Sequence, residues 1–199
     1  AIALEPESLN CEAILQAWYP GQAGGQAVAE VLFGDYNPAG KLPLTFYRNL
    51  AQIPDFEDYN MTGRTYRYMK ETPLFPFGHG LSYTTLKYGK LKMHDDKIAV
   101  GQNMNLVIPV TNTGSRDGDE VVQVYLKKMD DTEGPVKTLR AFKRVRIPAG
   151  KTVEVKFSLD DTQLEWWDEQ SNTMRVCPGN YTGMIGGTCC EEGFISRAF

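Results

Sequence analysis

The chain has 199 residues, of which 42% are hydrophobic and 23% are charged, and its formal net charge at pH 7 is −4. This length and apolar content suffice for one large or two small domains with a hydrophobic core. The acidic balance argues against nucleic acid or an anionic membrane surface as a partner. No apolar run approaches the roughly 18 residues of a membrane-spanning helix.

The first 47 residues contain one well-marked helix. After the pair Gly24–Gly25, the apolar residues Val28, Val31 and Leu32 recur at the spacing that places them on one helix face. Gly34 follows directly, and glycine commonly ends helices because it adopts the left-handed conformation without steric cost. The sequence therefore predicts a helix that ends at Gly34.

The rest of this segment favours strands. The apolar start Ala1–Leu4 predicts one strand, Ala13–Trp18 is a second apolar run, and Lys41–Phe46 predicts a short strand that Pro43 places at a sheet edge. A sheet of this size covers only one helix and leaves its other face open to water. We therefore interpret residues 1–47 as the end of an α/β-sandwich domain that packs on a partner, with a homodimer as one arrangement.

Residues 48–84 are interpreted as a loop and an interdomain linker. Residues 47–73 show no clean period, and a loop of this length is usually functional or packs on another domain. Arg and Tyr are the residue types that interfaces favour, and the candidate contact residues here are Arg64, Tyr66, Arg67 and Tyr68. The stretch Leu74–Thr84, rich in aromatic residues and interrupted by Pro76, Gly78 and Gly80, predicts a rigid apolar connection between two domains.

From residue 85 on, apolar residues recur with a period of two. Met104, Leu106, Ile108 and Val110 alternate with polar neighbours, and residues 153–159 alternate strictly. Further strands are expected around residues 122–126, 145–147, 164–166, 181–185 and 194–196. About seven short strands separated by turn signals predict an immunoglobulin-like or fibronectin type III-like sandwich over residues 85–199. The predicted fold class is α+β overall, a partial α/β sandwich followed by an all-β sandwich.

No stretch carries a convincing catalytic set. The carboxylates nearest the basic and aromatic loop, interpreted as a solvated surface, are Asp55, Glu57, Asp58 and Glu71. Ser82 follows His79 by three residues, but the strand–turn–helix elbow of serine hydrolases does not surround it. The stretch Gly21–Gly25 lacks the spacing and the Lys-Ser/Thr pair of a phosphate-binding loop, so helix entry is the favoured interpretation.

No metal site or cofactor is predicted, because neither the cysteines nor the histidines have the spacing of zinc ligands. The four cysteines are Cys11, Cys177, Cys189 and Cys190. A disulfide from Cys177 to one of the adjacent pair is one alternative, and free thiols are the favoured one.

Two features of the C-terminal part have alternative interpretations. On a two-residue period, one of Trp166 and Trp167 points into the core and the other is exposed. Trp167 together with Tyr125 would be the sugar platforms of a stand-alone carbohydrate-binding or adhesive module. A basic stretch, interpreted as the solvated face of a strand, consists of Lys137, Arg140, Lys143, Arg144 and Arg146.

Two long motifs resemble glycoside hydrolase family 3. Residues 17–46, AWYPGQAGGQAVAEVLFGDYNPAGKLPLTF, resemble the closing segment of the family's α/β-sandwich domain. YRY at residues 66–68 and PLFPFGHGLSYT at residues 73–84 resemble the linker to its C-terminal fibronectin type III-like domain. Residues 63–68 together with 77–80 look more like the β-xylosidase branch than the glucosidase branch. The resemblance covers essentially the whole chain.

The resemblance implies a retaining, exo-acting β-glycosidase, a β-xylosidase or β-glucosidase, in the breakdown of plant polysaccharides such as xylan. Family members carry the aspartate nucleophile on an N-terminal (β/α)₈ barrel and the glutamate acid/base on the α/β sandwich, upstream of the segment seen here. The expected partners are that barrel, the remainder of the α/β sandwich and a β-linked oligosaccharide. This chain alone is predicted to be inactive.

The remaining role is that of a scaffold in a secreted or periplasmic enzyme. The loop carrying Arg64, Tyr66, Arg67 and Tyr68 would brace the active-site wall or contact the barrel.

Overall fold

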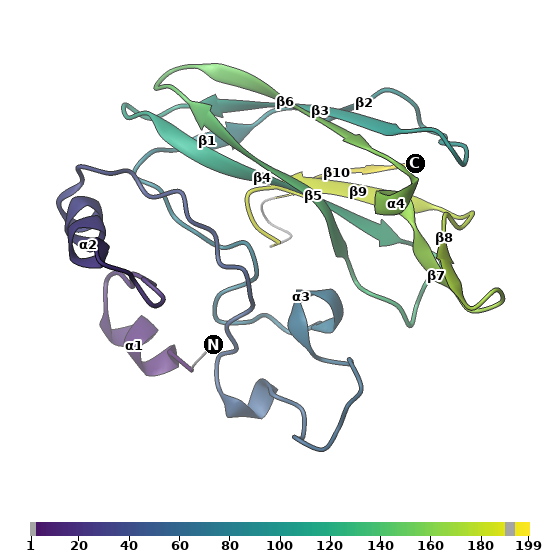
Figure 1. Ribbon diagram of the computed structural model, residues 1–199, viewed down its shortest axis with the longest axis horizontal. Coiled ribbons are helices and arrows are strands. Elements are labelled where there is room, and N and C mark those ends of the chain that lie inside the picture. The colour runs from purple at the N-terminus through teal and green to yellow at the C-terminus, as the bar shows by residue number, and fades with distance from the viewer. Residues whose placement is uncertain (1–2, 190–193) are drawn as a thin grey trace.

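A computed structural model describes residues 3–189 and 194–199 of the chain (Figure 1). Every strand among these residues lies after residue 85, whereas residues 3–84 hold short helices and long irregular segments. The helical elements of this first part are α1 (Glu5–Asn10), α2 (Gly24–Phe33), the 3-10 turn η1 (Leu50–Gln52) and α3 (Thr65–Tyr68). No helix in the described ranges is long and apolar enough to cross a lipid bilayer.

Residues 85–199 form a sandwich of two antiparallel sheets, as the alternating pattern predicts. The first sheet consists of β1 (Leu86–Tyr88), β2 (Lys92–Met93), β3 (Met104–Asn112) and β6 (Thr152–Leu159). The second consists of β4 (Gly118–Lys128), β5 (Thr138–Ile147), β9 (Tyr181–Gly186) and β10 (Ile195–Ala198). The strand β3 pairs with every other strand of its sheet, and β4 lies between β5 and β9. The predicted α+β fold class is confirmed.

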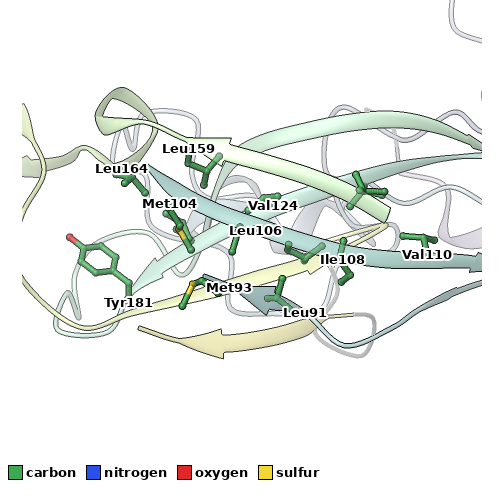
Figure 2. Packing of buried hydrophobic residues seen from close by; sticks show 14 of the residues in the cluster. Leu91, Met93, Met104, Leu106, Ile108, Val110, Val124, Leu159, Leu164 and Tyr181 are labelled. Atoms are coloured by element: carbon green, nitrogen blue, oxygen red, sulfur yellow. The ribbon is translucent and has the colours of Figure 1, made fainter. Parts of the chain in front are cut away.

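The hydrophobic core lies between the two sheets (Figure 2). Met104, Leu106, Ile108 and Val110 of β3 are at most 1% exposed, because alternate side chains of a strand point to the same face. Burying one such side chain fully contributes about 1.5–3 kcal/mol. The strand β3 therefore supplies a large share of the apolar contact that holds the sandwich together.

One predicted strand of the sandwich is placed differently. Leu164 ends the one-turn helix α4 (Asp161–Leu164), and the strand β7 (Trp166–Asp168) begins two residues later and pairs with β8 (Thr173–Arg175). The helix begins because the Asp160 carboxylate accepts a hydrogen bond from the Thr162 backbone, as part of a capping box.

The strands predicted in residues 1–47 do not form among the described residues. Residues 3–4 lead directly into α1, and residues 13–18 are irregular and exposed. Only Phe46, at the end of the predicted strand Lys41–Phe46, makes an isolated bridge, to Phe75. A strand needs a partner for its backbone N–H and C=O groups. No adjacent strand offers one in the part of the chain that the structure describes.

The predicted helix is confirmed as α2, and the described residues leave part of its apolar surface uncovered. Gly34 ends it with φ of 80°, and the Gly34 N–H donates to the Val31 carbonyl at 3.1 Å. Leu32 and Phe33 remain 65% and 85% exposed. Among the described residues 3–47, the buried ones are Ala39, Thr45 and Phe46. This segment therefore builds no core of its own here.

The linker predicted over Leu74–Thr84 makes hydrogen bonds to both flanking parts. Toward the N-terminal part, the Gly78 N–H donates to the Leu42 carbonyl at 2.7 Å. Toward the sandwich, the side chain of Gln123 donates to the carbonyls of Gly187 at 2.7 Å and Gly78 at 3.5 Å. Gln123 is only 3% exposed, so the bond to Gly78 is a buried link between β4 and the linker, whereas the bond to Gly187 links β4 to the segment that follows β9.

Asn37 joins three segments just beyond α2. Its side-chain oxygen accepts hydrogen bonds from the Ser82 hydroxyl at 2.9 Å and from the Tyr83 backbone at 2.7 Å. Its side-chain nitrogen donates to the Asp117 carbonyl at 2.9 Å. The Asn37 side chain therefore links the end of α2 to the linker and to the turn before β4.

Candidate functional site

Arg64, the first of the four predicted contact residues, stabilises its own loop. Its guanidinium donates to the carbonyls of Asn60 at 3.0 Å and Asp55 at 3.1 Å, and it also bonds the Asp58 carbonyl. The next residue, Thr65, has φ of 56°, a conformation that L residues rarely adopt. Arg64 therefore holds the turn that leads into α3.

Tyr66 faces inward and fixes α3 on the sandwich. Its ring stacks on Phe77 with centroids 4.4 Å apart and meets Tyr125 edge-on at 5.8 Å. Its hydroxyl accepts a hydrogen bond from the Leu139 backbone at 3.1 Å. Aromatic contacts of this kind contribute about 0.5–1.5 kcal/mol beyond their buried area, so Tyr66 anchors the loop.

Arg67 and Tyr68 line a pocket of about 550 Å³ between α3, the β4–β5 connection and the β7–β8 ribbon. Figure 1 shows α3 and this ribbon on either side of that connection. The guanidinium carbon of Arg67 lies 5.6 Å from the centre of the Tyr68 ring. The backbone carbonyl of Arg67 accepts a hydrogen bond from the Val136 N–H at 2.7 Å. The pocket contains two of the four predicted residues.

The opposite wall is formed by β5 and β7. The Arg140 guanidinium stacks over the Trp166 ring at 4.7 Å and donates to the Glu165 carbonyl at 2.8 Å. Trp166 is 5% exposed and Trp167 is 52% exposed, which confirms that one tryptophan points inward and the other outward. Burial, and then the neighbouring charge of Arg67, lower the pKa of Arg140.

The structure corrects two interpretations of this region. Tyr125 is 0% exposed beneath Tyr66, so it cannot be a sugar platform. The basic stretch is not one solvated face: Lys143, Arg144 and Arg146 are exposed, whereas Arg140 is folded onto Trp166. The prediction was wrong because Arg140 is the extra, unpaired residue of a β-bulge: Val124 pairs with Ala141, and Tyr125 pairs with Leu139.

The other sequence candidates have structural roles. The carboxylates of Asp55 and Asp58 accept backbone hydrogen bonds at 2.9 Å from residues two positions later, and the bonds to Asn60 lower the pKa of Asp58. Ser82 donates to Asn37 rather than contacting His79. The Gly24 N–H donates to the Gly21 carbonyl at 3.0 Å as α2 begins, as expected for helix entry.

Cys11 and Cys177 have free thiols, so the disulfide alternative at Cys177 is not formed; Cys190 lies outside the described residues. No group of three or more His, Cys, Asp or Glu residues within those ranges is arranged to hold a metal ion.

His79 in the linker is expected to make the stability of the chain depend on pH. Its ring stacks on Phe75 at 5.4 Å; burial, followed by the charge of Lys41, lowers the pKa of His79 below the usual 6.5. As the pH falls through 6.5 the unfolded chain takes up the proton first, so stability is fully present above that pH and decreases below it. We expect the unfolding midpoint in urea to fall between pH 7.5 and pH 5.5.

A matched pair of variants isolates this effect. His79→Gln is expected to reduce the pH dependence, whereas His94→Gln, at an exposed position on the sandwich, is expected to leave it intact. An unchanged pH dependence in His79→Gln would contradict the assignment.

Comparison with known proteins identifies both parts of the chain. Residues 1–83 match the glycosyl hydrolase family 3 C-terminal domain, and residues 120–189 match a fibronectin type III-like domain. A xylan 1,4-β-xylosidase from Xylanibacter ruminicola is 54% identical over 192 residues, which are 96% of this chain and 22% of that protein. A periplasmic β-glucosidase from Salmonella typhimurium is 37% identical over 198 residues, covering 93% of this chain and 26% of that protein.

The fold agrees with a solved member of the family. A family 3 β-glucosidase from Bifidobacterium adolescentis matches with a TM-score of 0.86 and 28% identity, over 100% of this chain and 31% of that one. The chain spans about a quarter of the length of the relatives named above. It therefore belongs to glycoside hydrolase family 3 and corresponds to the C-terminal portion of its members.

Proposed function

We propose that this chain is the C-terminal structural part of a retaining β-glycosidase, and that it supports a catalytic site carried by other domains of the same enzyme. The observation that carries the proposal is the distribution of exposed apolar side chains. Most of the large hydrophobic side chains that the described residues leave exposed lie before residue 85. The most exposed are Tyr19, Phe33, Phe56 and Tyr59, at 85% or more.

An apolar surface of this extent marks a contact with another protein or domain. The occupants we propose are the remainder of the α/β sandwich and a (β/α)₈ barrel. The proposed division of the chain is residues 1–47 as the end of the α/β sandwich, 48–84 as loop and linker, and 85–199 as the fibronectin type III-like domain. The match of residues 1–83 to the family's C-terminal domain supports this order.

The proposed activity of the whole enzyme is exo-acting removal of β-linked xylose, in the breakdown of xylan. Its support is the 54% identity to a protein named a xylan 1,4-β-xylosidase, against 37% to one named a β-glucosidase. The proposed location is secreted or periplasmic, since the latter relative is named periplasmic.

For the loop we propose a place at the wall of the active site or against the barrel. Arg64 and Tyr66 hold its shape through bonds within this chain, while Arg67 and Tyr68 line the open pocket. Two residues thus fix the conformation of the loop, and the other two are free to contact another domain or a ligand, as is common for loops that carry function.

Phe33→Glu in the intact enzyme tests the scaffold role. We expect a lower melting temperature and a lower kcat/KM for an aryl β-xyloside, because a carboxylate would be buried against the neighbouring domain. The same change in the 199-residue chain is expected to leave its melting temperature unchanged, because Phe33 is 85% exposed there. Tyr68→Ala in the intact enzyme tests the proposed place of the loop, again by the melting temperature and by kcat/KM.

Phe142→Glu, on the exposed face of β5, is the matched control and should leave the intact enzyme unchanged. The proposal fails if Phe33→Glu, like Phe142→Glu, leaves the melting temperature and kcat/KM of the intact enzyme unchanged. It also fails if the 199-residue chain hydrolyses the xyloside by itself. Native mass of that chain also tests for the homodimer that its uncovered apolar face would favour.

A further inference from the structure

Three residues that line the pocket described above each carry a buried polar atom without a hydrogen-bond partner. These atoms are Nε of Arg67, Nε of Arg140 and Oγ1 of Thr138, and Thr138 is only 9% exposed. A buried donor left unsatisfied costs about 1–3 kcal/mol, and native proteins rarely leave several in one place. The three residues share one pocket, where a ligand that accepts hydrogen bonds could bind the outer N–H groups of the two guanidiniums.

The two guanidiniums favour an anionic ligand. An arginine side chain is positively charged, and among the described residues neither of these two forms an ion pair. Glu165 acts on Arg140 through its charge, and two of the four acidic side chains that line the pocket already have partners. Asp131 accepts from the Trp166 indole at 2.8 Å and from the Gly134 backbone at 2.6 Å, and Asp130 accepts from the Asn180 backbone at 3.0 Å.

The ligand that satisfies two adjacent guanidiniums is a carboxylate, because its two oxygens match the planar arrangement of the guanidinium N–H groups. Lys128 adds a further positive charge to the lining, while Glu133 and Glu169 lie at exposed positions. An anion at this point would also offset the mutual repulsion that lowers the pKa of Arg140.

The aromatic side chains that line the pocket favour a ligand that contains a ring. Trp167 is 52% exposed, and both Trp167 and Tyr68 line the pocket. Exposed tryptophan and tyrosine rings provide flat apolar surfaces with a polar edge, and about 550 Å³ is within the usual range for a small-molecule site. A sugar ring that carries a carboxylate has both required features.

We propose that this pocket binds an acidic sugar, with the carboxylate between Arg67 and Arg140 and the ring against Trp167. The choice of a sugar acid over other carboxylates rests on the proposed role in β-glycoside breakdown. The site lies on α3 and the sandwich, where it would recognise an acidic substituent of the substrate.

The test is a binding titration that does not depend on hydrolysis. Sodium D-glucuronate is added to the intact enzyme and to the 199-residue chain, and heat and tryptophan fluorescence are followed, since Trp166 and Trp167 both line the pocket. We expect saturable binding to both, with no saturation by D-glucose, which has the same ring without the carboxylate. Sodium acetate, which has the carboxylate without the ring, is expected to bind more weakly than D-glucuronate.

Arg67→Gln and Arg140→Gln are each expected to weaken D-glucuronate binding about tenfold or more, because each removes a charge-assisted hydrogen bond. Arg146→Gln, the same change on the exposed end of β5, is the control and should bind normally. If Arg140→Gln does not fold, the D-glucuronate affinity of Arg67→Gln alone tests the proposal.

The proposal is overturned if D-glucuronate does not saturate, if D-glucose binds equally well, or if neither arginine variant weakens binding. Binding to the 199-residue chain but not to the intact enzyme also overturns it, because a carboxylate side chain of another domain would then occupy the pocket. None of these outcomes contradicts the scaffold role, which the Phe33→Glu experiment tests separately.

Discussion

Leu106→Ala is expected to lower the free energy of unfolding of the 199-residue chain by about 2–5 kcal/mol. Leu106 is 0% exposed in the middle of β3, and its strand neighbours are Met93 on β2 and Phe157 on β6. Alanine at this point leaves a cavity between the sheets that the surrounding strands cannot fill by small movements. Urea denaturation, followed by circular dichroism, measures the change from the shift of the midpoint.

Leu81→Ala is the matched control for this experiment. Leu81 lies in the linker and is 77% exposed, so the same deletion should change the free energy of unfolding by no more than about 0.5 kcal/mol. Equal losses in the two variants would show that the interior of the sandwich is not the main source of stability.

Gly80→Ala is expected to destabilise the chain by about 1–3 kcal/mol, because it forces two backbone segments apart. A Cβ atom at residue 80 would lie 2.1 Å from the carbonyl oxygen of Gly40, which cannot rotate away as a side chain would. The same contact region includes the hydrogen bond from the Leu42 N–H to the His79 carbonyl at 2.8 Å. Thermal unfolding and hydrogen exchange of the Leu42 amide would both report the change.

Gly40→Ala provides the control on the other side of the same contact. A Cβ atom at residue 40 meets nothing within 4 Å, so this variant should melt within a degree or two of the parent chain, as surface changes usually do. If Gly80→Ala melts like Gly40→Ala and the Leu42 amide remains protected, the close approach is not what holds the linker in place.

The sandwich was predictable from the sequence because each of its long strands buries one face against a partner within the chain. Met104 to Val110 shows this most clearly, since burial alternates as the apolar residues do. The helix α2 was predictable for a local reason, because its last turn and the left-handed Gly34 are adjacent in sequence. In both cases the information lies within about ten residues.

The N-terminal strands and the pocket were not predictable by that means. An apolar run such as residues 13–18 becomes a strand only beside another strand, and the pattern does not show whether one is present. The pocket joins Arg67 of α3 to Arg140 of β5 and to the β7–β8 ribbon. No local spacing connects these residues, and only the folding of the linker onto β4 brings them together.

The Asn37 side chain has a consequence for how the molecule moves. It bonds the linker at Ser82 and Tyr83 and the sandwich at Asp117, directly beyond the end of α2. A hinge at the linker would have to break these bonds together, so rotation of the sandwich carries α2 with it. The uncovered face of α2 and the pocket lined by Arg67 and Arg140 therefore keep a constant orientation relative to each other. A domain bound to the helix would move with any rotation of the sandwich.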